Sequence, residues 1–570
     1  MKYELGIVDY LVLILVFGIS ILIGFYHGLK QRVKNYFSKD KVILKESVAD
    51  YFTASSSMKS VPVAFSLLAS FFSTTGILGV PAEVYQYGLQ YWVTAFSGIF
   101  APVIGAFTTG PFFAHLRIFT VFQYLQLRFG SKYVKYIGTV CYLIKTSISS
   151  SIFIFGPAVS LSLFTSFSNN YSIALVGVIA TLYTAIGGIK GVIWTDFFQV
   201  IVMVGFLVSV FIKGIYDIGG FGNFFQINSS GGRFNVFDFD PDPFKRQTFW
   251  SLFFGFLLSF SYSYSTDQQS LQRFQATRTK KLAQRALLLN VPGVFIMLSL
   301  CCFAGLILYA NFAGCDPLAS QQIDNPNQLV GYFVITSFRN VQGAAGFFLS
   351  CVFSSSLSSA SSCLNSISSV LWEDYFKPFS YFKNLSESKK LTTTKMLVVA
   401  SGTVSTLFAF MISSFGSNLS QVSGSLNGAL NSPILGLFVL GCMFKTSNSV
   451  GAACGCMIGF IFGLWISFGA YITKPYYPKL NVTTEFCDFD FLSRNQSVIT
   501  SDLSGFNKFY SISYMWYTPM GTLVTVLSGL IISIATGGLK QNVDDSFILY
   551  KYFIKKKVGD EVELPSLANN

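Results

Sequence analysis

Six serines share one side of a single apolar stretch, and hydroxyl oxygens in that pattern are suited to binding a cation. Residues 349–371 read LSCVFSSSLSSASSCLNSISSVL. At helical periodicity the apolar residues form one stripe, and the opposite face carries Ser355, Ser358, Ser359, Ser362, Ser366 and Ser369. Neutral hydroxyl and carbonyl oxygens can replace the hydration shell of Na+ without trapping the ion as carboxylates would. The alternative is that these serines permit close helix packing and bond to carbonyls of their own helix.

Two other stretches combine an apolar span with a polar or helix-breaking middle. Residues 66–88 contain Ser73, Thr74, Gly76 and Pro81, and such a sequence is a poor continuous helix. A break at membrane depth is tolerated where it faces protein or a water-filled cavity, and unwound carbonyls there can bind a coupling ion. The alternative is a kink without a ligand. The stretch 259–274 is similarly polar, and two interrupted helices in corresponding halves predict an inverted repeat with a site between them.

The composition places these stretches in a membrane protein. The chain has 570 residues, of which 52% are hydrophobic and 11% charged, whereas a soluble domain carries about a quarter charged residues. The net charge of +13 lies mostly in short loops, which indicates membrane topology rather than nucleic-acid binding. Ten scattered cysteines and two distant histidines, His27 and His115, give no zinc or iron–sulfur pattern. We expect no enzyme activity and no cofactor, with Na+ as the coupling ion and the lipid bilayer as surroundings.

The hydropathy pattern predicts an all-α polytopic fold with about 13 transmembrane helices in one domain over residues 1–540. The predicted spans are 6–28, 60–86, 91–113, 133–165, 171–188, 191–215, 248–271, 284–312, 332–372, 392–415, 419–443, 447–472 and 511–537. We interpret 6–28 as an extra first helix, 60–443 as the core, 447–537 as further extra helices and 541–570 as a cytosolic tail.

The basic residues predict an orientation. One set of loops contains 28 Lys and Arg residues and the opposite set 10, so we place the amino terminus outside the cell, the carboxyl terminus in the cytosol and the protein in the plasma membrane. The predicted outer loops contain the sequons at Asn228, Asn481 and Asn495, which are candidate glycosylation sites. Cys315 and Cys487 also lie in outer loops and could form a disulfide there.

Several separated motifs resemble the sodium:solute symporter family. They are GGIKGVIWTDFFQV (187–200), TDQQSLQRF (266–274), LGVPAEVYQYGLQY (78–91), NVFDFDPDPFKRQTFW (235–250) and the serine stretch itself. The third and fourth look most like the branch that holds the iodide, monocarboxylate and multivitamin symporters. The resemblance implies a LeuT-like core of five plus five helices in an inverted repeat, with extra helices around it.

The same resemblance implies positions for the site. The family's common sodium site falls on the hydroxyls of Ser358 and Ser359 and on the backbone carbonyls of Ala69, Phe72 and Ser355. Two carboxylates correspond to residues with gating or coupling roles.

Those two carboxylates are Asp196, which resembles the family's signature aspartate, and Asp267, which resembles the one near the gate. An alternative for Asp196 is a structural role, as a helix cap or paired with Lys190 or Arg285. Buried carboxylates in a membrane are costly, so either one is a candidate functional group.

Three departures from the family pattern concern the solute. The iodide transporter has a glutamine where this chain has Gly76 and a tyrosine where it has Ser149, which argues against iodide. Lys145, inside a span, could be a counter-charge for a solute carboxylate or a substitute for a second Na+, or it could extend to the membrane interface. The predicted solute cavity comprises Ser73, Thr74, Gly76, Lys145, Ser149, Tyr264 and Asp267.

These observations together predict a sodium-coupled symporter that imports a small organic anion, such as a monocarboxylate or vitamin, by alternating access. The alternatives are a non-transporting sensor or ligand-gated ion leak on the same scaffold, and an iodide or other inorganic-anion symporter.

Overall fold

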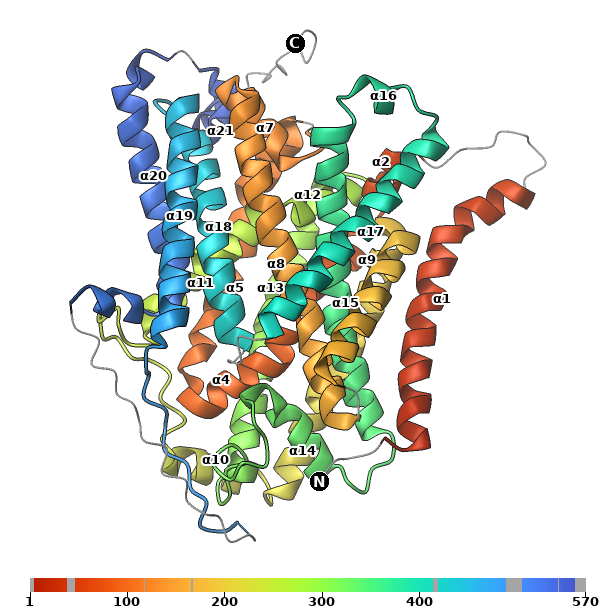
Figure 1. Ribbon diagram of the computed structural model, residues 1–570, viewed down its shortest axis with the longest axis vertical. Helices are drawn as coiled ribbons and strands as arrows, with labels where there is room; N and C mark the ends of the chain where they lie inside the picture. The colour runs from red at the N-terminus through yellow and green to blue at the C-terminus, as the bar shows by residue number, and fades with distance from the viewer. Residues whose placement is uncertain are drawn as a thin grey trace.

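Nearly all of the described chain is helical. The computed structural model describes residues 5–37, 47–116, 118–165, 168–413, 419–487, 505–541 and 543–558. In these ranges, ten helices are long and apolar enough to cross a membrane, and α3 and α4 pass the same test together as a pair bent by 59°. The long helices stand side by side, with α16 and α21 at one end of the assembly and α10 and α14 at the other (Figure 1).

The long helices are α1 (Ile7–Phe37), α5 (Val93–Phe107), α8 (Lys132–Phe164), α9 (Asn169–Asp217), α13 (Lys280–Phe312), α15 (Ala344–Val370), α17 (Glu387–Ile412), α18 (Leu419–Met443), α19 (Ser449–Thr473) and α20 (Tyr517–Ala535). Two helices are interrupted. The first consists of α3 (Ser60–Phe71), the π-helical turn η2 (Thr75–Gly79) and α4 (Val80–Tyr87). The second consists of α11 (Phe249–Ser265) and α12 (Gln268–Ala276). The shorter helices are α2 (Val48–Thr53), α6 (Thr109–Leu116), α7 (Val121–Phe129), α10 (Phe221–Ser230), α14 (Leu329–Ser337), α16 (Ser380–Lys383) and α21 (Leu549–Val558).

The helix α9 covers two of the predicted spans. Its 49 residues would extend roughly 73 Å if straight, more than twice the hydrocarbon thickness of a bilayer. The helix breaks at Gly188, where φ is 57° and ψ is 178°. A Cβ atom there would lie 2.9 Å from the ring of Tyr51, so both the backbone angles and the close approach require glycine. The break separates the predicted spans 171–188 and 191–215.

The predicted span 332–372 is wrong as a single helix. The chain forms α14, leaves helical geometry, and starts again as α15 after Gly343, whose φ is 89°. The sequence SFRNVQGAAG supplies the polar and glycine residues that end the first helix, but its apolar flanks hide the interruption. The serine helix is therefore α15 alone. The candidate membrane span that contains it continues through the π-helical turn Leu371–Phe376.

The two interrupted helices meet at their breaks and at their ends. The ring of Phe71, the last residue of α3, contacts the ring of Tyr264 near the end of α11, with centroids 4.9 Å apart. Beyond α12, the chain pairs with the segment before α3, because the Met58 amide donates to the Ala276 carbonyl at 2.9 Å and Met58 forms an isolated bridge with Thr277. This arrangement is that of the predicted LeuT-like core, in which two broken helices face each other.

The serine helix lies at the centre of the assembly (Figure 1). The apolar window of its span is 94% buried by the rest of the protein, whereas that of α1 at the periphery is 17% buried. Part of the predicted tail is also helical: α21 packs against α6 and α18, and the Tyr124 hydroxyl donates to the carbonyl of Phe547, just before α21, at 3.0 Å. The cytosolic location of residues 541–570 stays a prediction, and residues 559–570 lie outside the described ranges.

Candidate functional site

The first break interrupts α3 halfway along its span. Phe72 ends the helix with φ −96° and ψ 85°, which turns its carbonyl out of the helical direction. The hydroxyls of Ser73 and Thr75 bond to each other at 2.7 Å, and the chain resumes as η2 and α4 with Pro81 in the first turn of α4. The interruption predicted from residues 66–88 is therefore present, and it exposes backbone oxygens to side chains on neighbouring helices.

The serine helix supplies a hydroxyl directly at this break. Ser359 donates to the Ser70 carbonyl at 3.0 Å and to the Ala69 carbonyl at 3.4 Å. Ser355 lies one turn earlier on α15, and its hydroxyl bonds to the Val352 carbonyl within the helix. Of the five residues of the predicted sodium site, Ala69 and Ser359 are in contact here, while Phe72 is buried at the break itself.

The hydroxyl of Ser358 points to a second group of buried polar side chains. It donates to Asp196 at 2.7 Å, and Asp196 also accepts from Ser66 at 2.5 Å. The guanidinium of Arg273 lies 3.3 Å from the same carboxylate and bonds to Ser66 and Ser362 at 2.9 and 2.6 Å.

The partner of Asp196 is therefore Arg273 from α12, and the expected pairing with Lys190 or Arg285 is wrong. Because both ions are fully buried, each needs the other and the surrounding hydroxyls to offset the loss of water. The predicted gating residue thus links α9, α12 and α15 close to the first break.

The second break lies between α11 and α12. Asp267 caps α12, because its carboxylate accepts from the Gln269 amide at 2.9 Å. The same carboxylate binds the ammonium of Lys145 at 3.1 Å and accepts from the Tyr142 hydroxyl at 3.4 Å. Lys145 is buried with its ammonium 4.9 Å from the centre of the Tyr262 ring, so the interpretation that it extends to the membrane interface is wrong. Its charge is already balanced by Asp267.

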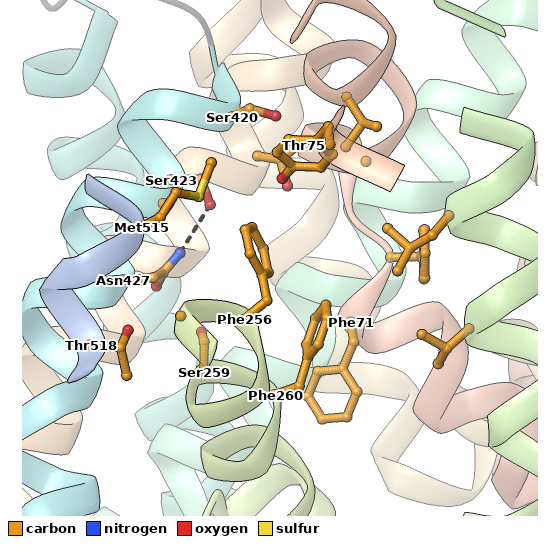
Figure 2. A pocket seen from close by; sticks show the side chains of 18 of the residues that line it. Phe71, Thr75, Phe256, Ser259, Phe260, Ser420, Ser423, Asn427, Met515 and Thr518 are labelled. Carbon is orange, nitrogen blue, oxygen red and sulfur yellow. Dashed lines mark hydrogen bonds between the residues drawn. The ribbon is translucent and has the colours of Figure 1, made fainter. Parts of the chain in front are cut away.

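A cavity of about 160 Å³ lies between the two breaks and α18. Figure 2 shows Thr75 and Phe71 from the first broken helix facing Phe256, Ser259 and Phe260 from α11, with Ser420, Ser423 and Asn427 of α18 across from them. Among the residues that the structure describes, no charged side chain lines this cavity. Its polar groups are hydroxyls, one amide and the phenols of three tyrosines, which carry no net charge. The Tyr264 phenol already donates to Asn290, so the donors open to a solute come from the other groups.

The predicted cavity residues fall into two groups. Gly76 and Tyr264 line the cavity, and Tyr264 is held by a hydrogen bond to Asn290 at 2.8 Å. The remaining predicted residues do not line the cavity, namely Ser73, Thr74, Lys145, Ser149 and Asp267. Ser149 stays connected to the cavity through its 2.6 Å hydrogen bond to Asn427, which does line it.

The sequence pattern did not lead us to predict that α18 and α20 line the cavity. Ser420, Ser423, Asn427 and Thr518 all line it. A signal was present, since residues 419–431 read LSQVSGSLNGALN, a small and polar run at the start of an apolar span. Such a run on a membrane helix indicates either close packing or a polar cavity, and here it does both: Gly424 and Gly428 pack on Tyr514 and Tyr517 while the polar residues face inward.

A buried ionic cluster lies beyond the cavity, towards the ends of the helices predicted to face outside. Arg246 forms a two-pronged contact with Glu83 at 2.7 and 2.8 Å and also bonds to Gln421 at 3.1 Å. Its guanidinium lies 5.3 Å from the ring centre of Tyr514, a residue that lines the cavity. This cluster joins α4, α18 and the segment before α11, and sequence reasoning did not identify it.

The outer-loop predictions have mixed outcomes. Cys315 and Cys487 are joined by a disulfide, with Cα atoms 5.0 Å apart. Asn228 is fully buried and its side-chain amide donates to the Phe224 carbonyl at 2.9 Å, which conflicts with a glycan at this residue. Asn481 is exposed, and Asn495 lies outside the described residues.

The sequence matches a known family and several characterised relatives. Residues 51–459 match the Sodium:solute symporter family. Sodium-coupled monocarboxylate transporter 1 of Xenopus laevis is 34% identical, with the match covering 95% of this chain and 87% of that protein. The human protein of the same name is 34% identical over 89% of this chain and 85% of its own length. The sodium-dependent multivitamin transporter of Oryctolagus cuniculus is 33% identical over 94% and 83%, respectively.

Two solved structures share the fold. A Na+-coupled sialic acid symporter in a substrate-bound outward-open state superposes with a TM-score of 0.73 at 22% identity, covering 93% of this chain and 98% of that one. A nucleobase-cation-symport-1 family transporter in a closed conformation gives a TM-score of 0.50 at 13% identity, over 86% and 95% of the two chains. At these identities the likeness concerns the arrangement of the helices, and it agrees with a LeuT-like fold.

Proposed function

Because the chain belongs to the sodium:solute symporter family, we propose that it couples the entry of Na+ to the import of a short monocarboxylate. The observation that carries this proposal is the contact between α15 and the first break, where a serine hydroxyl meets two backbone carbonyls beside an uncharged cavity. The sodium ion and the solute would bind on either side of Phe72, which belongs to the break and also lines the cavity.

The proposed ion site uses neutral oxygens. The carbonyls of Ala69, Phe72 and Ser355 and the hydroxyls of Ser358 and Ser359 would surround Na+, a set that suits a monovalent hard cation better than Ca2+ or Mg2+. A hydroxyl has one proton to donate and two lone pairs to offer. Ser358 gives its proton to Asp196, so its lone pairs remain directed away from that carboxylate and are available to a cation.

The proposed solute is small and carries one negative charge. The cavity volume of about 160 Å³ is below the roughly 300–1,000 Å³ of pockets that hold drug-sized ligands. This size favours lactate or pyruvate over biotin or pantothenate. Since no charged side chain lines the cavity, the carboxylate would be balanced by hydroxyl and amide donors and by the Na+ ion beyond Phe72. The solute would then bind well only when sodium is present.

Transport follows if the two ligands favour one conformation and their release favours the other. We propose that the Glu83–Arg246 cluster closes the route to the outer side and the Lys145–Asp267 pair the route to the cytosol. Both clusters hold charged groups that are buried now and would need new partners or water when their side opens. The orientation used here is the one predicted from the distribution of basic residues, with the amino terminus outside.

The test is radiolabelled uptake into cells or proteoliposomes containing the full chain. The solutes would be lactate, pyruvate, nicotinate, biotin, pantothenate and iodide, each with Na+ or choline as the external cation. We expect concentrative uptake of lactate and pyruvate in Na+ only, with little uptake of the two larger vitamins. Sodium-dependent current without accumulation would instead identify a sensor or ion leak, and preferred uptake of iodide would overturn the proposed solute.

A further inference from the structure

A second and larger cavity shares none of its lining residues with the solute cavity. Its volume is about 820 Å³, and its walls come from α5 and α6 on one side and from α12 and the start of α13 on the other. The carboxyl-terminal helix α21 closes one end through Tyr552 and Phe553. The helix α21 lies at the end of the assembly opposite α10 and α14 (Figure 1).

The polar part of this cavity is basic. Arg278, Lys280 and Lys281 line it, all three are exposed, and no Asp or Glu is among the lining residues. Within the described residues, none of these three cations has a carboxylate within 4 Å, in contrast to Lys377, which pairs with Glu373 at 2.7 Å near the same end of the assembly. The rim thus holds three positive charges that no carboxylate of the described residues balances.

The remaining walls are apolar and lead away from the rim along α5. Phe107 lines the cavity and is 53% exposed, and Ile104 and Phe100 continue the same stripe at 39% and 49% exposure. The spacing of these residues, three and then four positions apart, places them on one face of α5. An exposed apolar stripe on a membrane helix faces acyl chains, so the cavity joins a basic rim to a lipid-facing surface.

We propose that this cavity binds an acidic membrane phospholipid with more than one phosphate group, with the headgroup at Arg278, Lys280 and Lys281 and an acyl chain along the α5 stripe. Three unbalanced cations suit several phosphates better than the single charge of an ordinary phosphodiester, and a basic pocket at the cytosolic ends of membrane helices is suited to such headgroups.

The bound lipid would act on the inner half of the second broken helix. Leu271 and Phe274 of α12 form part of the cavity wall, and Gln275 holds α12 against the Ile118 carbonyl at 2.6 Å. Occupation of the space between α12 and α5 would therefore bias the position of α12 relative to the rest of the core. The lipid site is separate from the ion and solute sites, so its existence does not depend on which solute is carried.

The experiment measures lipid binding to the purified full chain in detergent micelles. Fluorescently labelled phosphatidylinositol 4,5-bisphosphate is titrated, with labelled phosphatidylserine and phosphatidylcholine as weaker and neutral probes, and inositol trisphosphate is added as a competitor. We expect the bisphosphate lipid to bind at least tenfold more tightly than phosphatidylcholine, and the soluble headgroup to compete only weakly because it lacks the acyl chain.

Variants assign the binding to this cavity. R278Q/K280Q/K281Q should weaken binding of the bisphosphate lipid at least tenfold, whereas K132Q/K383Q/K389Q, with the same charge change near the same end of the assembly, should not. Arg278 also donates to the Ser57 carbonyl at 3.1 Å, so K280Q/K281Q serves as a second variant that keeps this contact and should still lose several-fold in affinity. A283W fills the cavity without changing charge and should abolish the preference for the bisphosphate lipid.

Three results would overturn the proposal. Equal binding of phosphatidylcholine and the bisphosphate lipid would exclude a headgroup site. Equal loss in the cavity and control charge variants, with A283W binding normally, would indicate diffuse attraction to the basic surface. Inositol trisphosphate binding as tightly as the lipid would indicate a site for a soluble polyphosphate.

Discussion

The two breaks in the core differ in backbone form and in side-chain chemistry: the first resumes through a π-helical turn, whereas the second passes directly into α12 with Asp267 as its N-cap. At the first, Ser359 meets the carbonyls of Ala69 and Ser70, and the groups that touch the opened backbone are neutral oxygens. At the second, the ammonium of Lys145 lies 3.1 Å from Asp267, which caps the resumed helix. An unwound backbone therefore does not by itself make an ion site.

The first break, and not the second, is therefore the one available to a mobile cation. Neutral oxygens can bind Na+ and release it, because their attraction for the ion is moderate. The second break already holds a cation that is covalently attached to α8 and balanced by a carboxylate. An exchangeable ion is thus expected at the first break, and the second is expected to contribute rigidity or a conformational contact instead.

Disrupting the ion pair between Lys145 and Asp267 should reduce the stability of the protein strongly. Lys145→Gln leaves Asp267 buried without its cation and should lower the free energy of unfolding by about 3–5 kcal/mol. Thermal unfolding of the purified protein would measure this loss, together with surface expression. K145Q/D267N removes both charges and should recover most of the stability, so a double variant no better than the single one would show that the pair is not coupled.

A carboxylate placed between the breaks tests the charge of the solute. Asn427→Asp puts a negative charge into an otherwise uncharged cavity and should raise the KM for lactate about a hundredfold, since like charges in contact cost several kcal/mol. Asn427→Ala is the matched control and should change KM only several-fold. Equal effects of the two variants would show that the solute's charge is not sensed at α18.

The ion site itself is tested by the hydroxyl at the first break. Ser359→Ala removes one neutral ligand, and loss of about 1.4 kcal/mol would raise the half-saturating Na+ concentration roughly tenfold. The double variant S358A/S359A should raise it further while surface expression stays near normal.

The control for this prediction is Ser350→Ala, because the Ser350 hydroxyl bonds to the Gly346 carbonyl within the same helix. That variant should leave the sodium dependence unchanged. If S358A/S359A keeps the sodium dependence of the unaltered protein, the first break does not hold the coupling ion.

A substitution at Gly76 should affect solute binding more than Na+ binding, and its effect should be the weakest of those described. A Cβ atom at Gly76 would lie 3.1 Å from the ring of Phe72, so Gly76→Ala narrows the cavity slightly and displaces that ring. We expect a few-fold rise in the KM for pyruvate, with little change in the half-saturating Na+ concentration. A larger shift in the sodium dependence than in KM would place Gly76 with the ion.

Much of the fold could be predicted because it depends on local patterns. The interruption near Ser73 to Pro81 follows from residues that cannot continue a helix, and the serine face of α15 follows from helical periodicity. The break before Gly343 was missed because its flanks are as apolar as the helices they join. Local hydropathy does not distinguish one long span from two shorter helices in that case.

The partners across helices were much harder to predict. For Asp196, pairing with Lys190 or Arg285 is one alternative to a coupling role, but the side chain that reaches it is Arg273 of α12. The alternatives for Lys145 are a place at the membrane interface or facing a solute, but its partner is Asp267. That contact depends on how α8 crosses the second break. Such pairings are set by packing angles between helices, which a single sequence does not specify.

The hydrogen bond between the Met58 amide and the Ala276 carbonyl has a mechanical consequence for any opening towards the cytosol. It ties the chain that enters α3 to the chain that leaves α12, and the bond from Arg278 to Ser57 reinforces the same junction. We therefore expect the ends of α3 and α12 that meet at this junction to move together, so that a displacement of either is passed to the other independently of the ion site.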